Sequence, residues 1–103
     1  MQRIELLQSF IVDDPKDPFN CYGLALEYQK LGDARSNELF DKLLTDFSDY
    51  LPTYYTAAKH FESSDSLKAK GVYQKGIELA QQQNNNKALN ELKTALFNLE
   101  FED

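Results

Sequence analysis

The chain has 103 residues and a formal net charge of −6, from 17 acidic and 11 basic residues. This acidic balance argues against a protein that binds a nucleic-acid backbone, because such proteins normally carry a basic stripe. The single cysteine, Cys21, excludes a disulfide or a thiolate metal cluster within these residues.

The predicted elements are helices joined by short turns. Apolar residues at helical spacing predict a first helix over residues 2–12, which the following prolines end because each disfavours helix in the residue before it. The second helix begins at Pro18, after the N-cap residue Asp17, and stops at Gly32. Asp33 then caps the next helix. The remaining helices are predicted at about residues 34–47, 52–63, 66–83 and 86–100. No segment reads as a strand, so the sequence predicts an all-α fold.

Residues 21–47 and 54–80 carry the same pattern of small, apolar and aromatic residues at an offset of 33 positions. A period of this length, built from two helices and a turn, indicates a helical repeat in which each unit buries its face against a neighbour. The matched pairs, three of them identical, are Cys21/Tyr54, Tyr22/Tyr55, Leu24/Ala57, Ala25/Ala58, Tyr28/Phe61, Ser36/Ala69, Phe40/Tyr73, Lys42/Lys75, Leu43/Gly76 and Phe47/Ala80.

This pattern resembles the tetratricopeptide repeat, a helix–turn–helix unit of about 34 residues. The family's signature contains a tryptophan, a Leu-Gly pair, a tyrosine, an alanine, an aromatic residue, a further alanine and a proline. The residues that match it are Leu24-Ala25, Tyr28 and Phe40 in the first repeat, and Tyr54, Ala57-Ala58, Phe61, Ala69 and Tyr73 in the second. The chain departs from the signature at Cys21, which replaces the tryptophan, at Ser36, which replaces an alanine, and at Pro52, which lies later than the family's proline.

The resemblance implies a single domain over residues 1–103, folded as an antiparallel stack of helix hairpins with about six helices. Residues 18–47 are the expected first repeat and residues 51–83 the second. The final helix does not continue the repeat pattern, so the helices at 2–12 and 86–100 are expected to cap the two ends.

Proteins of this family use the first helix of each repeat to line a concave groove that holds a peptide or a helix of another protein. The resemblance therefore implies a non-enzymatic interaction module or scaffold that needs no cofactor. Carried over by register, the groove residues are Phe19, Tyr22, Leu26, Gln29, Lys30, Tyr55, Thr56, Lys59 and Glu62. Tyr22 and Tyr55 attract most interest because aromatic residues with polar tips are favoured at interfaces. The competing interpretation is that the last helix covers both tyrosines and that they belong to the core.

The last helix carries a second apolar face. At 100° per residue, Phe97 and Phe101 lie a quarter-turn or more from the stripe formed by Leu89, Leu92 and Leu96. One face can cap the repeats, which leaves the other for a second contact. The alternative function is therefore a homo-oligomeric structural or scaffold protein, for example a homodimer, that uses this helix or the groove for self-association.

Catalytic and metal-binding interpretations find little support in the sequence. His60 is the only histidine and lacks companions at metal-ligand spacing or a positioned nucleophile. Cys21 is better explained as a small packing residue than as a nucleophile. The N-terminal stretch lacks the continuous apolar core of a signal peptide, and no apolar run is long enough to span a bilayer. We therefore expect a cytoplasmic protein without enzymatic activity, metal, or contact with a membrane or nucleic acid.

Overall fold

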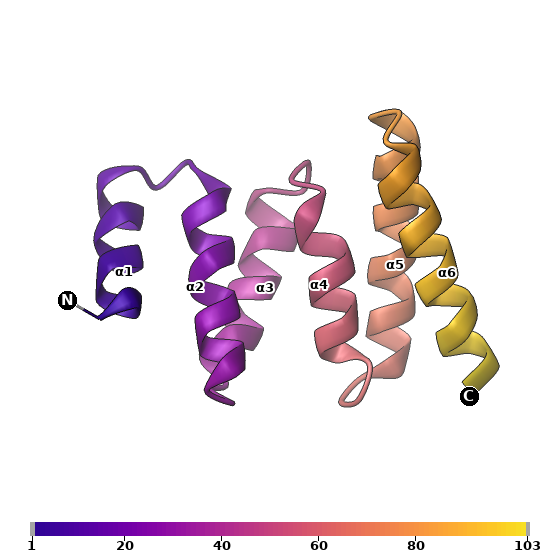
Figure 1. Ribbon diagram of the computed structural model, residues 1–103, viewed down its shortest axis with the longest axis horizontal. Coiled ribbons are helices and arrows are strands. Elements are labelled where there is room, and N and C mark those ends of the chain that lie inside the picture. The colour runs from indigo at the N-terminus through magenta and orange to yellow at the C-terminus, as the bar shows by residue number, and fades with distance from the viewer. Residues whose placement is uncertain (1, 103) are drawn as a thin grey trace. The chain divides into compact units, whose positions relative to one another are not determined.

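The computed structural model describes residues 2–102, which form six helices and no strand (Figure 1). The predicted all-α fold is confirmed. Along the chain, one compact unit ends at Tyr50 and a second begins at Leu51. None of the helices within the described residues combines the length and apolar character that a membrane span requires. The helices are α1 (Arg3–Asp13), α2 (Pro18–Lys30), α3 (Arg35–Asp46), α4 (Pro52–Phe61), α5 (Ser66–Gln82) and α6 (Asn86–Glu102).

The ends of the helices follow from local residue chemistry. The Asp17 carboxylate accepts a hydrogen bond from the backbone N–H of Phe19 at 3.0 Å, and the Asp65 carboxylate accepts one from Lys68 N–H at 3.0 Å. These bonds satisfy N–H groups that have no partner within the first turn of a helix. Gly32, with φ +67°, closes α2 in the left-handed conformation that glycine adopts without strain. Asn84, with φ 56°, makes the equivalent turn after α5.

In the first unit, α2 packs against both α1 and α3. Leu7 of α1 lies with Leu24 and Tyr28 of α2 in a buried cluster. Three partly buried apolar residues complete this cluster, namely Ile4, Ile11 and Leu39. The inward face of α1 thus carries only part of the apolar stripe that the sequence predicts, since Leu6 and Phe10 are exposed over 40% and 42% of their surfaces.

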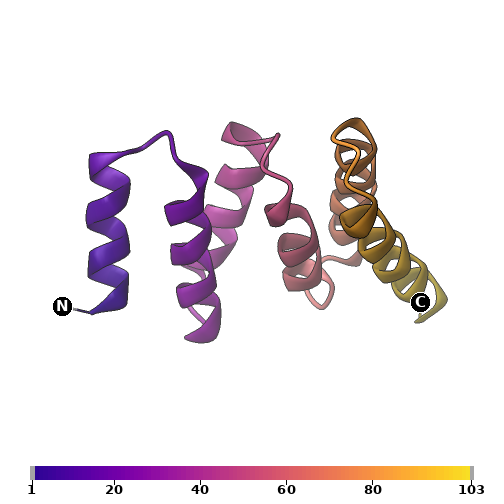
Figure 2. The same ribbon diagram turned by 45° about the horizontal axis from the view of Figure 1, so that its top comes forward.

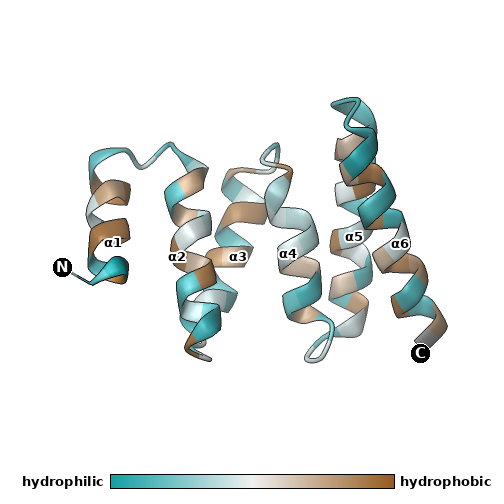
Figure 3. Ribbon diagram, viewed as in Figure 1, coloured by the Kyte–Doolittle hydropathy of each residue, from teal (hydrophilic) through white to brown (hydrophobic). Residues whose placement is uncertain are grey.

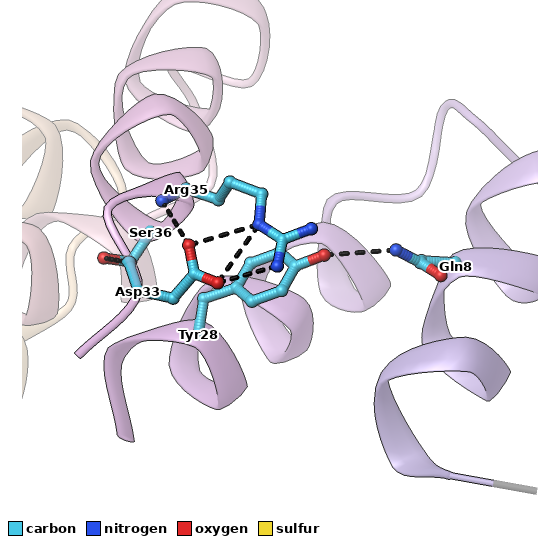
Figure 4. A network of polar contacts seen from close by, with 5 residues as sticks. All are labelled: Gln8, Tyr28, Asp33, Arg35 and Ser36. Atoms are coloured by element: carbon cyan, nitrogen blue, oxygen red, sulfur yellow. Dashed lines mark hydrogen bonds and ion pairs between the residues drawn. The ribbon is translucent and has the colours of Figure 1, made fainter. Parts of the chain in front are cut away.

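A polar network around the Tyr28 side chain ties the three helices of this unit together (Figure 4). The Gln8 amide donates to the Tyr28 hydroxyl at 3.1 Å, which links α1 to α2. The Arg35 guanidinium lies over the Tyr28 ring, 4.4 Å from its centroid. Asp33 holds that guanidinium through bonds of 2.7 to 3.2 Å. Because Asp33 precedes α3 and also accepts from the Arg35 backbone N–H at 2.9 Å, it fixes the start of that helix.

In the second unit, α5 packs against α4 on one side and α6 on the other, and α6 runs alongside α5 in both views (Figure 2). Gly76 of α5 lies where the three helices meet, close to Tyr54 of α4 and Leu92 of α6. The apolar stripe of α6 faces this core, because Leu92, Ala95 and Leu99 are all buried.

The 33-residue register also predicts burial. Every matched pair of small, apolar or aromatic residues is buried in both repeats, apart from Phe47/Ala80, whose first member is half-buried, and Tyr22/Tyr55, neither of which is fully buried. Both members of the lysine pair Lys42/Lys75 are exposed. Figure 3 shows the resulting alternation of apolar and polar residues along the helices. The pattern that the two segments share is therefore a packing pattern.

Candidate functional site

The predicted groove residues of the first unit lie along α2, on residues that the core leaves partly or fully accessible. Tyr22, Leu26 and Gln29 are half-buried, and Phe19 is exposed over 64% of its surface. The Tyr22 ring meets the ring of Tyr50 edge to face, with 5.9 Å between centroids. Tyr22 is therefore partly engaged in packing within its own unit.

Lys30 has different surroundings from the other predicted groove residues of α2. Together with Glu27 it lines a cleft of about 450 Å³ between the first turn of α1 and the last turn of α2. Its ammonium lies 3.1 Å from a Glu27 carboxylate oxygen, while Arg3 holds the other oxygen at 2.8 Å. Lys30 thus takes part in an ion-pair network that joins α1 to α2.

In the second unit, two predicted residues line a cleft of about 320 Å³ between α4 and α6. Tyr55 and Lys59 contribute the α4 wall, and 39% of the Tyr55 surface is exposed. The α6 wall consists of Asn90, Glu91, Thr94, Ala95 and Asn98. The last helix is therefore a wall of this cleft and does not cover Tyr55.

A network behind the α4 wall holds Tyr55 and Lys59 in place. The Tyr55 ring meets Tyr73 of α5 edge to face, with 6.4 Å between centroids. The buried Tyr73 hydroxyl donates to the Glu62 carboxylate at 2.5 Å, and Lys59 lies 3.7 Å from the same carboxylate oxygen. Burial and this hydrogen bond raise the pKa of Tyr73, so its hydroxyl remains a donor near neutral pH. Glu62 thus supports the cleft wall, whereas the half-buried Thr56 does not line the cleft.

The sequence predicts α6 as a capping helix, so the polar wall that it contributes to the cleft is not among the predicted site residues. Its polar residues carry a signal that could have revealed it. Asn90, Thr94 and Asn98 recur every four residues, so they share one side of a helix, away from the buried Leu92 and Leu99. Side-chain amides and a hydroxyl along one wall both donate and accept hydrogen bonds, as the main chain of an extended peptide requires.

Phe97 and Phe101 are exposed over 58% and 77% of their surfaces. Their rings lie against each other, with 4.7 Å between centroids and 40° between ring planes. They form an aromatic patch on the side of α6 that faces away from its core stripe, as the helical spacing predicts.

The structure gives neither Cys21 nor His60 the surroundings of a catalytic or metal-binding residue. Burial raises the pKa of the Cys21 thiol, which keeps it protonated rather than nucleophilic at neutral pH. The His60 ring meets Phe61 edge to face, 5.1 Å between centroids, and burial lowers its pKa. Within residues 2–102, no group of three or more His, Cys, Asp or Glu side chains is placed to hold a metal ion.

Comparison with solved structures identifies the architecture. A tetratricopeptide repeat domain protein from Salinibacter ruber, solved by solution NMR, is 38% identical to this chain, with a TM-score of 0.82 over 87% of this chain and 93% of that one. The chain belongs to the tetratricopeptide repeat family. A crystal structure of a tetratricopeptide repeat domain protein from the same organism is 37% identical, with a TM-score of 0.79 over 84% of this chain and 100% of that one.

Comparisons by sequence alone do not reach this result, since no family model and no curated protein matches the chain. The sequence-based resemblance to tetratricopeptide repeats is nevertheless confirmed by these two solved structures. Tetratricopeptide repeats are in general protein-interaction modules, and repeats of this kind present extended concave surfaces to their partners.

Proposed function

We propose that this tetratricopeptide repeat protein binds a short segment of another protein in the cleft between α4 and α6. The observation that supports this most directly is the composition of the cleft, in which an exposed aromatic ring, Tyr55, faces a polar wall from α6. An aromatic anchor beside adaptable hydrogen-bonding groups is the combination that peptide-binding surfaces use.

The chemistry of the cleft favours an extended peptide that is gripped by its main chain. Asn90, Thr94 and Asn98 offer hydrogen bonds at regular spacing, while Tyr55 offers a flat apolar surface to one side chain of the peptide. Lys59 and Glu91 bring one charge of each sign, so the cleft does not require a strongly charged partner. On α2, we keep Phe19, Tyr22, Leu26 and Gln29 as proposed contacts of the same partner class.

This proposal is tested with peptides selected from a random displayed library against the whole protein. Tyr55→Ala should raise the Kd of a selected peptide by about tenfold or more, as expected for loss of an aromatic anchor. Asn98→Ala and Lys59→Ala should weaken binding by smaller factors. Gln74→Ala and Lys75→Ala are matched controls, since both residues are exposed on α5 and line no part of the cleft.

Circular dichroism and thermal unfolding of each variant check that the fold is retained. Peptides that bind Tyr55→Ala and Asn98→Ala as tightly as wild type would contradict the proposal. A selection that yields no peptide above background would contradict it as well.

A further inference from the structure

The α6 helix carries two separate stripes of side chains. The first is buried against the rest of the second unit and contains Leu92, Ala95 and Leu99. The second, which we call the outer seam, consists of Asn90, Thr94, Phe97 and Phe101, all exposed. At 100° per residue the two stripes lie on nearly opposite sides of the helix.

The spacing of the outer seam is that of a coiled coil. Its members follow one another at intervals of four, three and four residues, which is the repeat that keeps one face of a helix against a partner helix. Its two aromatic members expose 58% and 77% of their surfaces and lie against each other. A large exposed aromatic pair on one helix marks an interaction surface.

The charges beside the seam indicate what that partner is. Lys93 and Glu100 are seven residues apart, so they occupy the same flank of the seam. Both side chains are exposed, and within residues 2–102 neither forms a hydrogen bond or an ion pair. The flank thus carries one positive and one negative charge, on either side of Phe97.

A second copy of α6 complements this flank when the two helices run antiparallel. A two-fold axis between Leu96 and Phe97 sets Lys93 of each copy opposite Glu100 of the other, which gives two equivalent ion pairs, and it brings the Phe97 rings together. A parallel pair would place Lys93 beside Asn98 of the other copy, which gives no ion pair. The surface is thus complementary to itself in one orientation only.

We propose that the protein forms a symmetric homodimer through the outer seam of α6, with antiparallel helices and reciprocal Lys93–Glu100 ion pairs. The interface is distinct from the proposed peptide contact at Tyr55. It shares Asn90 and Thr94 with the cleft wall, so the dimer and a bound peptide compete for these two residues.

Sedimentation equilibrium of the whole protein, from micromolar to millimolar concentration, tests this proposal. Wild type should show a reversible monomer–dimer equilibrium. Lys93→Glu and Glu100→Lys should each raise the dimer Kd roughly tenfold, because two symmetry-related pairs change from attraction to repulsion. The double variant Lys93→Glu/Glu100→Lys should restore the wild-type Kd, and Phe97→Ala should weaken the dimer without any change of charge.

Lys75→Glu and Glu78→Lys are the matched controls. They make the same changes in net charge at exposed positions of α5, outside the seam, and should leave the Kd unchanged. A wild-type protein that stays monomeric over the whole range overturns the proposal. Single charge variants that behave like the α5 controls overturn it too, as does a double variant that fails to restore the dimer.

Discussion

Gly76 of α5 faces Tyr54 of α4 across a gap that admits no side chain. A Cβ atom built on Gly76 would lie 2.7 Å from the Cβ of Tyr54 and 3.2 Å from both terminal methyl carbons of Leu92. The Tyr54 Cβ is attached directly to the backbone and cannot rotate away. Glycine at this position therefore allows α4 and α5 to approach closely and α6 to pack against them.

Gly76→Ala should lower the free energy of unfolding, by about 1–3 kcal/mol, because the added methyl overpacks the junction of three helices. Gly71→Ala in the same helix is the matched control, since nothing lies within 4 Å of a Cβ there. That control should gain about 0.5–1 kcal/mol from the higher helix propensity of alanine. Urea unfolding measures both changes. Equal gains in the two variants would contradict the packing that we describe.

Thr53 is a buried residue at which a substitution should stabilise the fold. Its side chain is fully buried in α4, and its hydroxyl has no hydrogen-bond partner within residues 2–102. Thr53→Val replaces that hydroxyl with a methyl group of similar size and should stabilise the protein by about 1 kcal/mol. Thr53→Ser keeps the hydroxyl, loses the methyl and should destabilise it. A lower melting temperature for Thr53→Val than for wild type would show that the hydroxyl is satisfied.

The Asp33–Arg35 pair predicts a dependence of stability on acid pH. The side-chain and backbone hydrogen bonds from Arg35 hold the pKa of the Asp33 carboxyl at about 2, below its ordinary value of 3.8. The pair therefore contributes stability above pH 3.8, and that contribution is lost as the pH falls through about 2. Asp33→Asn should be less stable than wild type at pH 7, and the difference should disappear near pH 2. Urea unfolding at several pH values measures it, and a constant difference would be inconsistent with the depressed pKa.

The buried Tyr73 hydroxyl predicts that the stability of the fold depends on pH under alkaline conditions. Burial, with the hydrogen bond to Glu62, raises the pKa of its phenol above the ordinary value of 10. The stability that follows is present below pH 10 and is lost as the pH rises further, because only the unfolded chain then ionises this group. Tyr73→Phe should cost about 1–2 kcal/mol at pH 7. The variant should also lose less stability than wild type as the pH is raised above 10; an equal loss would count against the buried hydrogen bond.

The fold could be predicted from the sequence because the residues that pack the helices recur at a fixed interval along the chain. Small residues such as Ala25 and Ala58 recur 33 positions apart, and that interval is visible without any structure. The walls of the cleft were harder to predict. Asn90 and Thr94 interrupt the repeat pattern, because they are polar at positions where the 33-residue register expects packing residues, and both line the cleft. Only the placement of α6 beside Tyr55 gives them a role.

The position of Lys30 is a second feature that the sequence pattern could not predict. Register alone assigns it to the groove, since it lies one turn beyond Leu26 on α2. Its actual position depends on Arg3 and Glu27, and thus on how α1 packs against α2. That packing involves residues outside the repeat, for which the 33-residue pattern holds no information.

The single domain expected over residues 1–103 and the cytoplasmic location stay predictions.

The cleft between α4 and α6 is the proposed peptide-binding site. The most direct test is an NMR titration of the isotope-labelled protein with a library-selected peptide, following the backbone amide shifts of each residue. The largest shifts should fall on Tyr55, Lys59, Asn90, Thr94 and Asn98, and Tyr55→Ala should strongly reduce them at a peptide concentration near the wild-type Kd. Shifts confined to other surfaces, with these five residues unchanged, would contradict the assignment of the site.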